Sequence, residues 1–103
     1  MTTALLEKEI TYIENTLQEN ELTHLKVSKR GDNIVIYSEG VNGKENRCRF
    51  INKKRGMFNL NMANHTGRWE PTPFEGSLEE LLEMVIGQFP WTLTNYEQDN
   101  GIL

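Results

Sequence analysis

Cysteine, histidine and long apolar runs are scarce in this 103-residue chain. Its single cysteine, Cys48, excludes an internal disulfide and a metal site built from several cysteines. The two histidines, His24 and His65, lack the spacing and the cysteine partners of a zinc site, so we expect no bound metal. No apolar stretch approaches the roughly 18–20 residues that cross a bilayer, and the N-terminal stretch lacks the basic start of a signal peptide. The sequence therefore predicts a cytoplasmic protein without a membrane segment.

The sequence patterns of common catalytic sites are missing as well. Neither a Walker A pattern nor a Gly-x-Gly-x-x-Gly run occurs, so no phosphate-binding loop is expected. Cys48 falls in a predicted strand, which favours a small buried side chain over a nucleophile. The glutamates of the predicted helices fall on solvent faces, which favours solubility over acid–base chemistry. We predict no cofactor, and nothing in the pattern supports an enzyme.

Charge is abundant and unevenly distributed. Residues 24–68 hold ten of the eleven basic side chains and three of the fifteen acidic ones, a net charge of +7. The rest of the chain carries −11, which gives the overall −4. This separation predicts one cationic and one anionic layer, and it indicates where a partner could bind without identifying that partner.

Apolar periodicity predicts a helix near each end of the chain. From Ala4 to about Glu19, one stripe of apolar residues recurs at steps of four and three. Its members are Leu6, Ile10, Ile13 and Leu17. A second helix is expected to begin at Ser77, which forms a capping box with Glu80, and to end before Pro90.

Between the helices, the pattern predicts strands with short, glycine-containing connections. The predicted strands are Leu25–Lys29, Asn33–Ser38, Asn46–Ile51 and Met57–Ala63. Asn42-Gly43 is typical of a tight hairpin turn, and connections this short join only antiparallel neighbours. We therefore predict one domain over residues 1–103, with residues 97–103 frayed. Its fold is an α+β two-layer sandwich of order α-β-β-β-β-α, a four-stranded antiparallel meander with both helices on one face.

The strand register after Gly40 decides which side chains face the helices. A strict two-residue loop would turn Arg47 and Arg49 toward them, at a cost of several kcal/mol for each unpaired guanidinium. A bulge at Gly40, or a longer loop, would turn Cys48 and Phe50 there instead, and we predict this arrangement. The predicted core is Leu25, Val27, Ile34, Ile36, Cys48, Phe50, Phe58, Leu60 and Met62.

The opposite face of the predicted sheet is mainly polar and cationic. It is expected to show Lys26, Ser28, Val35, Tyr37, Arg47, Arg49, Asn59 and Asn61. Cations and amides around one aromatic ring are suited to an anionic or nucleotide-like surface. The alternative is a solvated face whose cations pair with nearby acids.

The stretch from His65 to Gly76 is predicted to be a long loop that two prolines stiffen. In a binding interpretation, His65 and Arg68 hold an anionic group, Trp69 stacks on a planar moiety and Glu70 lies beside them. In a packing interpretation, Trp69 plugs the open end of the sandwich together with Phe74, and Arg68 pairs with Glu70 or Glu75. Both interpretations remain open at the level of the sequence.

This stretch also carries a resemblance. The run from His65 to Phe74, followed by Gly76 and a leucine-rich helix that ends in Phe89-Pro90-Trp91-Thr92-Leu93, resembles a block shared by small uncharacterised bacterial proteins. The resemblance covers roughly the last third of the chain, with a looser match over His24–Asp32. It implies a bacterial protein in which the loop matters, and it brings no activity, cofactor or catalytic residue with it.

Three functions compete at this point. The first is a non-catalytic binding or regulatory domain that contacts another protein, or a second copy of itself, through the stretch from His65 to Gly76 and the cationic sheet face. The second is single-stranded nucleic-acid binding through that face, with Tyr37 stacking on a base. The third is a small-molecule enzyme or sensor whose pocket brings His65 and Arg68 together.

Overall fold

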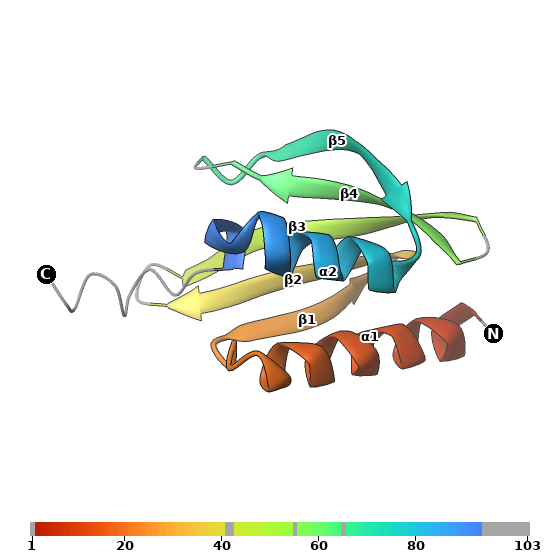
Figure 1. Cartoon of the computed structure of the whole chain (residues 1–103), viewed down its shortest axis with the longest axis horizontal. Coiled ribbons are helices and arrows are strands. Elements are labelled where there is room, and N and C mark those ends of the chain that lie inside the picture. Colours follow the sequence, from red (N-terminus) through yellow and green to blue (C-terminus); the bar gives the residue numbers. More distant parts are fainter. Residues whose placement is uncertain (1, 41–42, 55, 65, 94–103) are drawn as a thin grey trace, which may run out of the picture.

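Two helices lie against one face of a five-stranded antiparallel sheet (Figure 1). The computed structural model describes residues 2–40, 43–54, 56–64 and 66–93, and these counts refer to that part of the chain. The elements are α1 (Thr2–Glu19), β1 (Leu25–Arg30), β2 (Asn33–Gly40), β3 (Gly43–Lys54), β4 (Met57–Ala63), β5 (Trp69–Gly76), α2 (Leu78–Gln88) and a 3-10 turn, η1 (Pro90–Leu93). The strands are ordered β1-β2-β3-β4-β5, as a meander.

The predicted α+β class and the antiparallel sheet are confirmed, but the predicted four strands and the loop from His65 to Gly76 are wrong. Residues 69–76 form a fifth strand, β5, which pairs with β4 at one edge of the sheet. Pro71 and Pro73 argue against a central strand because proline donates no ladder hydrogen bond. An edge strand tolerates them, and there they also limit pairing with a further chain.

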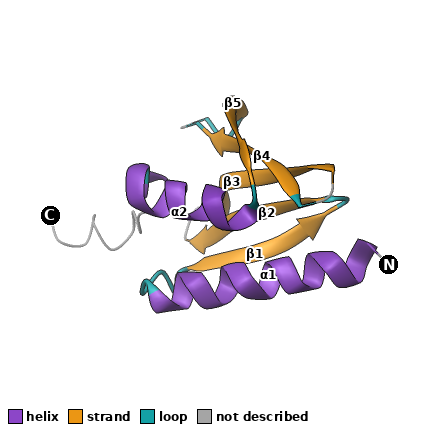
Figure 2. Ribbon diagram, turned by 45° about the vertical axis from the view of Figure 1, so that its right-hand side comes forward, coloured by secondary structure: helices purple, strands orange, loops and turns teal. Residues whose placement is uncertain are grey.

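Both helices face the same side of the sheet, as predicted (Figure 2). The capping box of Ser77 and Glu80 is present at the start of α2, with the Ser77 side chain accepting from the Glu80 N–H at 3.1 Å. Ile13 of α1 and Leu81 of α2 belong to one apolar cluster with the sheet. All nine sheet residues predicted for the core are buried in this cluster or packed against it.

A β-bulge at Arg47 sets the register between β2 and β3. Ile36 pairs with Cys48 whereas the next residue, Tyr37, pairs with Asn46, so Arg47 is the extra residue of β3 at this bulge. The bulge turns Cys48 and Phe50 into the core, as predicted, because it moves the alternation of β3 by one residue.

The position of this bulge differs from the prediction. Gly40 pairs with Gly43, so β2 and β3 are joined by residues 41 and 42, which lie outside the described residues. The extra residue sits within β3 rather than at Gly40. Its consequence for Arg47 is described below.

Two further predictions concern the ends of the chain and its membrane contacts. The predicted frayed segment, residues 97–103, lies outside the described residues. In the part of the chain that is described, neither helix has the length and apolar character needed to cross a membrane.

Candidate functional site

The sheet face turned away from the helices, called the outer face here, carries most of the predicted binding residues. One row crosses all five strands on this face, because the paired residues are Ser28, Val35, Arg49, Asn61 and Pro71 in strand order. Val35 is only 4% exposed although it lies outside the helix-facing apolar cluster. The centre of the outer face is therefore packed by its own side chains.

Arg49 lies at the middle of this row and is held from two sides. Its guanidinium carbon is 4.6 Å from the centre of the Trp69 ring, and its Nη2 donates to Asn61 Oδ1 at 2.7 Å. Its Nε is buried and has no hydrogen-bond acceptor. Among the described residues, no carboxylate lies within ion-pair distance of this guanidinium. Arg49 is thus an oriented, partly buried cation without an acidic partner.

Two of the predicted residues, Asn59 and Asn61, link Arg49 to the edge strand. Asn61, 3% exposed, donates to Asn59 Oδ1 at 3.0 Å. Asn59 Nδ2 donates in turn to the carbonyls of Thr72 and Phe74 at 3.1 Å each, and the Thr72 hydroxyl donates to the Leu60 carbonyl. These side chains replace ladder hydrogen bonds where the β4–β5 register shifts between Asn59 and Asn61.

Asn59 should accordingly be important for stability. We expect Asn59→Ala to lower the free energy of unfolding by about 2 kcal/mol, because two β5 carbonyls lose their donor. Asn46 is the matched control, since it lies on the same face and makes no side-chain hydrogen bond within the described chain. Urea denaturation of both variants measures the difference, and an equal, small loss in the two would show that the Asn59 amide does not hold β5.

A second group of predicted residues lies at the β1–β2 side of the outer face. Lys26 Nζ is 2.8 Å from Glu39 Oε1, and this hydrogen bond, with the charge of Glu39, raises the pKa of Lys26. Lys44 Nζ lies 4.3 Å from the centre of the Tyr37 ring. The Tyr37 and Trp69 rings thus each carry a cation on one face, which reduces the stacking surface that single-stranded nucleic acid would need.

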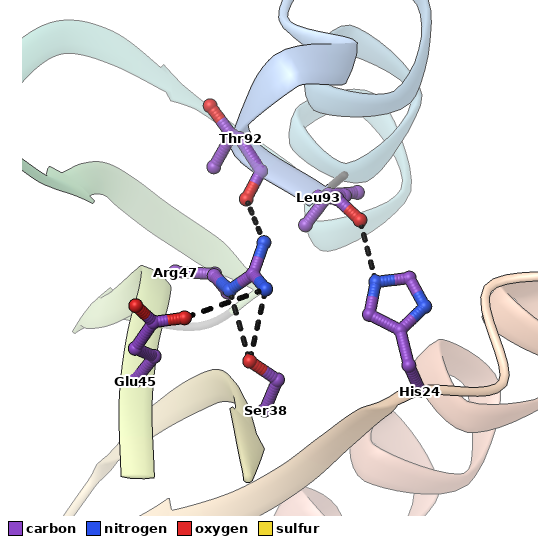
Figure 3. A network of polar contacts seen from close by, with 6 residues as sticks. All are labelled: His24, Ser38, Glu45, Arg47, Thr92 and Leu93. Atoms are coloured by element: carbon purple, nitrogen blue, oxygen red, sulfur yellow. Dashed lines mark hydrogen bonds and ion pairs between the residues drawn. The ribbon is translucent and has the colours of Figure 1, made fainter. Parts of the chain in front are cut away.

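Arg47 was predicted to lie on the outer face, and this prediction is wrong. Its side chain is 5% exposed and lies on the helix side of the sheet, beneath η1 (Figure 3). Nε and Nη2 donate to Ser38 Oγ at 3.2 and 2.9 Å, and Nη1 donates to the Thr92 carbonyl at 3.1 Å. Glu45 Oε1 is 3.8 Å from Nη2. The bulge aims the guanidinium at these acceptors, so Arg47 has a structural role.

His24, in the connection between α1 and β1, also contacts the 3-10 turn η1. Its Nε2 is 2.8 Å from the carbonyl oxygen of Leu93, one residue after the carbonyl that Arg47 binds (Figure 3). No sequence pattern links residues 24, 47 and 92–93, so this network was not predicted. The one signal in the sequence was Ser38, a hydroxyl on the helix-facing side of β2, because a buried arginine requires hydrogen-bond acceptors.

The turn before β5 places the remaining predicted residues. Asn64 Oδ1 accepts from the backbone N–H groups of Thr66 and Arg68, and its Nδ2 donates to Glu70 at 3.1 Å. Arg68 is exposed and pairs with no acid in the described chain, which differs from the packing interpretation. His65 lies outside the described residues.

The aromatic side chains of β5 point to different places. Phe74 packs against the core and lies 5.8 Å, centre to centre, from the Phe89 ring, as the packing interpretation expects. Trp69 instead lies over Arg49 on the outer face and plugs no opening of the sandwich.

A cavity of about 770 Å³ lies where the end of β4, the start of β3 and η1 meet. Its described lining carries both charge signs, with Lys44, Arg47 and Glu70 beside Trp91. Arg68 is not part of that lining. The convergence of His65 and Arg68 that the small-molecule hypothesis needs therefore has no support from the described residues.

Two further chemical features belong to this description. Burial raises the pKa of the Cys48 thiol to about 12, so this side chain stays protonated and unreactive near neutral pH. Among the described residues, no three His, Cys, Asp or Glu side chains come together as a metal-binding group.

Comparison of the chain with protein-family models, with curated proteins and with solved structures found no match. The function must therefore be argued from the geometry of the outer face itself.

Proposed function

We propose that this protein is a non-catalytic binding module that recognises another protein through its outer face. The observation that carries the proposal is Arg49, an oriented and partly buried guanidinium with no carboxylate partner in the described chain. An arginine with free donors is suited to a carboxylate, because its planar fork matches the two carboxylate oxygens. The partner is thus expected to bring an acidic group to Arg49.

The hydrogen-bonding state of the outer face supports this proposal. Arg49 Nε and Ser28 Oγ are buried without a partner, and they flank Val35 on the same cross-strand row. Leaving a buried polar atom unpaired costs about 1–3 kcal/mol. Two such atoms on one row are an arrangement that stability alone does not favour, which sets this row apart from an ordinary packed sheet face.

The residue types and their order also suit protein recognition. Arginine, tryptophan and tyrosine contribute disproportionately to protein interfaces, and Arg49, Trp69 and Tyr37 all lie on the outer face. Arg49 is already held by Trp69 and Asn61, so little side-chain entropy would be lost on binding.

Selection from a random peptide library on the immobilised protein tests the proposal. We expect the enriched peptides to carry a carboxylate and Arg49→Gln to weaken their binding at least about tenfold, since a charged hydrogen bond contributes about 1.5–3 kcal/mol. Arg49→Lys, which keeps the charge but loses the fork and much of the stacking, should recover only part of the affinity.

Lys8→Gln provides the matched control, because it removes one exposed cation from α1 in the opposite layer. Equal affinity of the wild type and Arg49→Gln for every enriched peptide would contradict the proposal. Preference for single-stranded oligonucleotides over all peptides would support the nucleic-acid alternative instead.

A further inference from the structure

Two hairpin turns place four cations at the same end of the sheet. The β1–β2 turn follows Lys29 and Arg30, and the β3–β4 turn follows Lys53 and Lys54. Alternate turns of a meander share an end, and Figures 1 and 2 both show these two side by side. All four side chains are exposed. This group of Lys29, Arg30, Lys53 and Lys54 is called the cationic end.

The cations of this end are unpaired within the described chain. The ion pairs found there involve Lys26 and Arg47, and no member of the cationic end. Asp32 is the acid that the sequence places in these two turns, against five cations when Arg55 is counted. Four of the ten basic side chains of residues 24–68 therefore lie at one end of the sheet, away from the centre of its outer face.

The two turns are held together at their bases. Asn33 Oδ1, at the start of β2, accepts from the Asn52 N–H at 3.3 Å, next to Lys53. Gly31 has a φ of 62° and Gly56 a φ of 64°, the left-handed conformation that tight turns require and glycine adopts readily. Because neighbouring strands are about 4.8 Å apart, the two turns are separated by roughly 10 Å.

We propose that the cationic end binds a short acidic segment of a protein partner. An extended chain rises about 3.3 Å per residue, so a segment of a few acidic residues spans the roughly 10 Å between the two turns. Exposed cations of this kind raise the association rate and favour partners of negative charge more than they add affinity. The cationic end shares no residue with the Arg49 site, so this inference does not depend on the proposed function.

The surroundings of the cationic end favour a short peptide over a long polyanion or a membrane. The described residues of the two turns include no aromatic side chain for a base to stack on. Gly76 pairs with Phe58, so α2 begins at this end and brings Glu79 and Glu80, whose charges limit the length of any anionic segment that the two turns can hold. The exposed apolar side chain at this end is Met57, which is 37% exposed. One such side chain is too little apolar surface to anchor the protein in lipid.

A fluorescein-labelled peptide of eight glutamates tests this proposal by fluorescence anisotropy with the full chain. We expect binding at about 50 mM NaCl that weakens strongly by about 300 mM, because screening acts on exposed charges. The double variant Lys53→Glu/Lys54→Glu should lose at least about tenfold in affinity. Its urea midpoint should match that of the wild type, since both side chains are exposed at a turn.

The matched control is Lys26→Glu/Lys44→Glu, which changes the net charge equally on the outer face. It should keep most of the peptide affinity. Equal losses in the two double variants would overturn the proposal, because binding would then follow net charge alone. So would an eight-nucleotide single strand, or vesicles containing phosphatidylserine, bound as tightly as the peptide.

Discussion

Replacing Arg47 with alanine should lower the free energy of unfolding by about 3 kcal/mol. The guanidinium is buried at the bulge of β3 and donates to Ser38 Oγ and to the Thr92 carbonyl. Its removal leaves both acceptors buried without a donor, at about 1–3 kcal/mol each, and opens a void below η1. Urea denaturation, followed by circular dichroism, measures the loss as a lower midpoint with an unchanged slope.

Arg49→Ala is the control for this experiment, because Arg47 and Arg49 are two positions apart in β3 and the bulge places them on opposite sides of the sheet. Arg49 lies on the outer face and is partly exposed, so we expect its loss to cost about 1 kcal/mol. The free energy of unfolding of Arg47→Lys should lie between those of the wild type and Arg47→Ala, since one ammonium group cannot make all the hydrogen bonds of the planar guanidinium. If Arg49→Ala were the more destabilising of the pair, the placement of Arg47 at the bulge would be wrong.

Phe50→Ala should cause the largest loss, about 4 kcal/mol, because this ring is fully buried at the centre of the apolar cluster. Such a loss is a large part of the 5–15 kcal/mol that stabilises a typical domain of this size. Thermal and urea denaturation should therefore show a variant that is partly unfolded near physiological temperature.

The neighbouring Ile51 tests the register in the same experiment. Ile51 pairs with Asn59 on the other face of the sheet and is only partly buried. We expect Ile51→Ala to cost about 1 kcal/mol, a third or less of the Phe50→Ala loss. A larger loss for Ile51→Ala than for Phe50→Ala would mean that β3 presents its opposite side to the helices and that the bulge is misplaced.

The helices and the core could be predicted because their signals are local. The capping box of Ser77 and Glu80 and the stripe of Ile13 and Leu17 follow from spacing alone. The inward direction of Phe50 was predicted for a physical reason, the cost of burying two unpaired arginines. That reason was half correct, because one arginine is buried after all and has its hydrogen-bond acceptors.

The missed features depend on partners that are distant in sequence. Strand β5 contains Pro71 and Pro73, and its edge position and the hydrogen bonds that it receives from the Asn59 side chain cannot be deduced from its own residues. Arg47 was assigned to the outer face because simple alternation ignores where a bulge falls. Trp69 was expected to bind or to plug an opening, and its contact with Arg49 required the unpredicted fifth strand.

The contact between Arg47 and Thr92 also constrains the order of folding. The two residues are 45 positions apart, and the His24–Leu93 contact spans 69 positions. Strands β1 to β4 can pair through short turns, but Arg47 gains its carbonyl acceptor only when η1 docks on the sheet. Contacts between such distant residues form late and slow folding. The same contacts join the first strand, the bulge and the last turn, so we expect the sheet and η1 to unfold together in one cooperative transition.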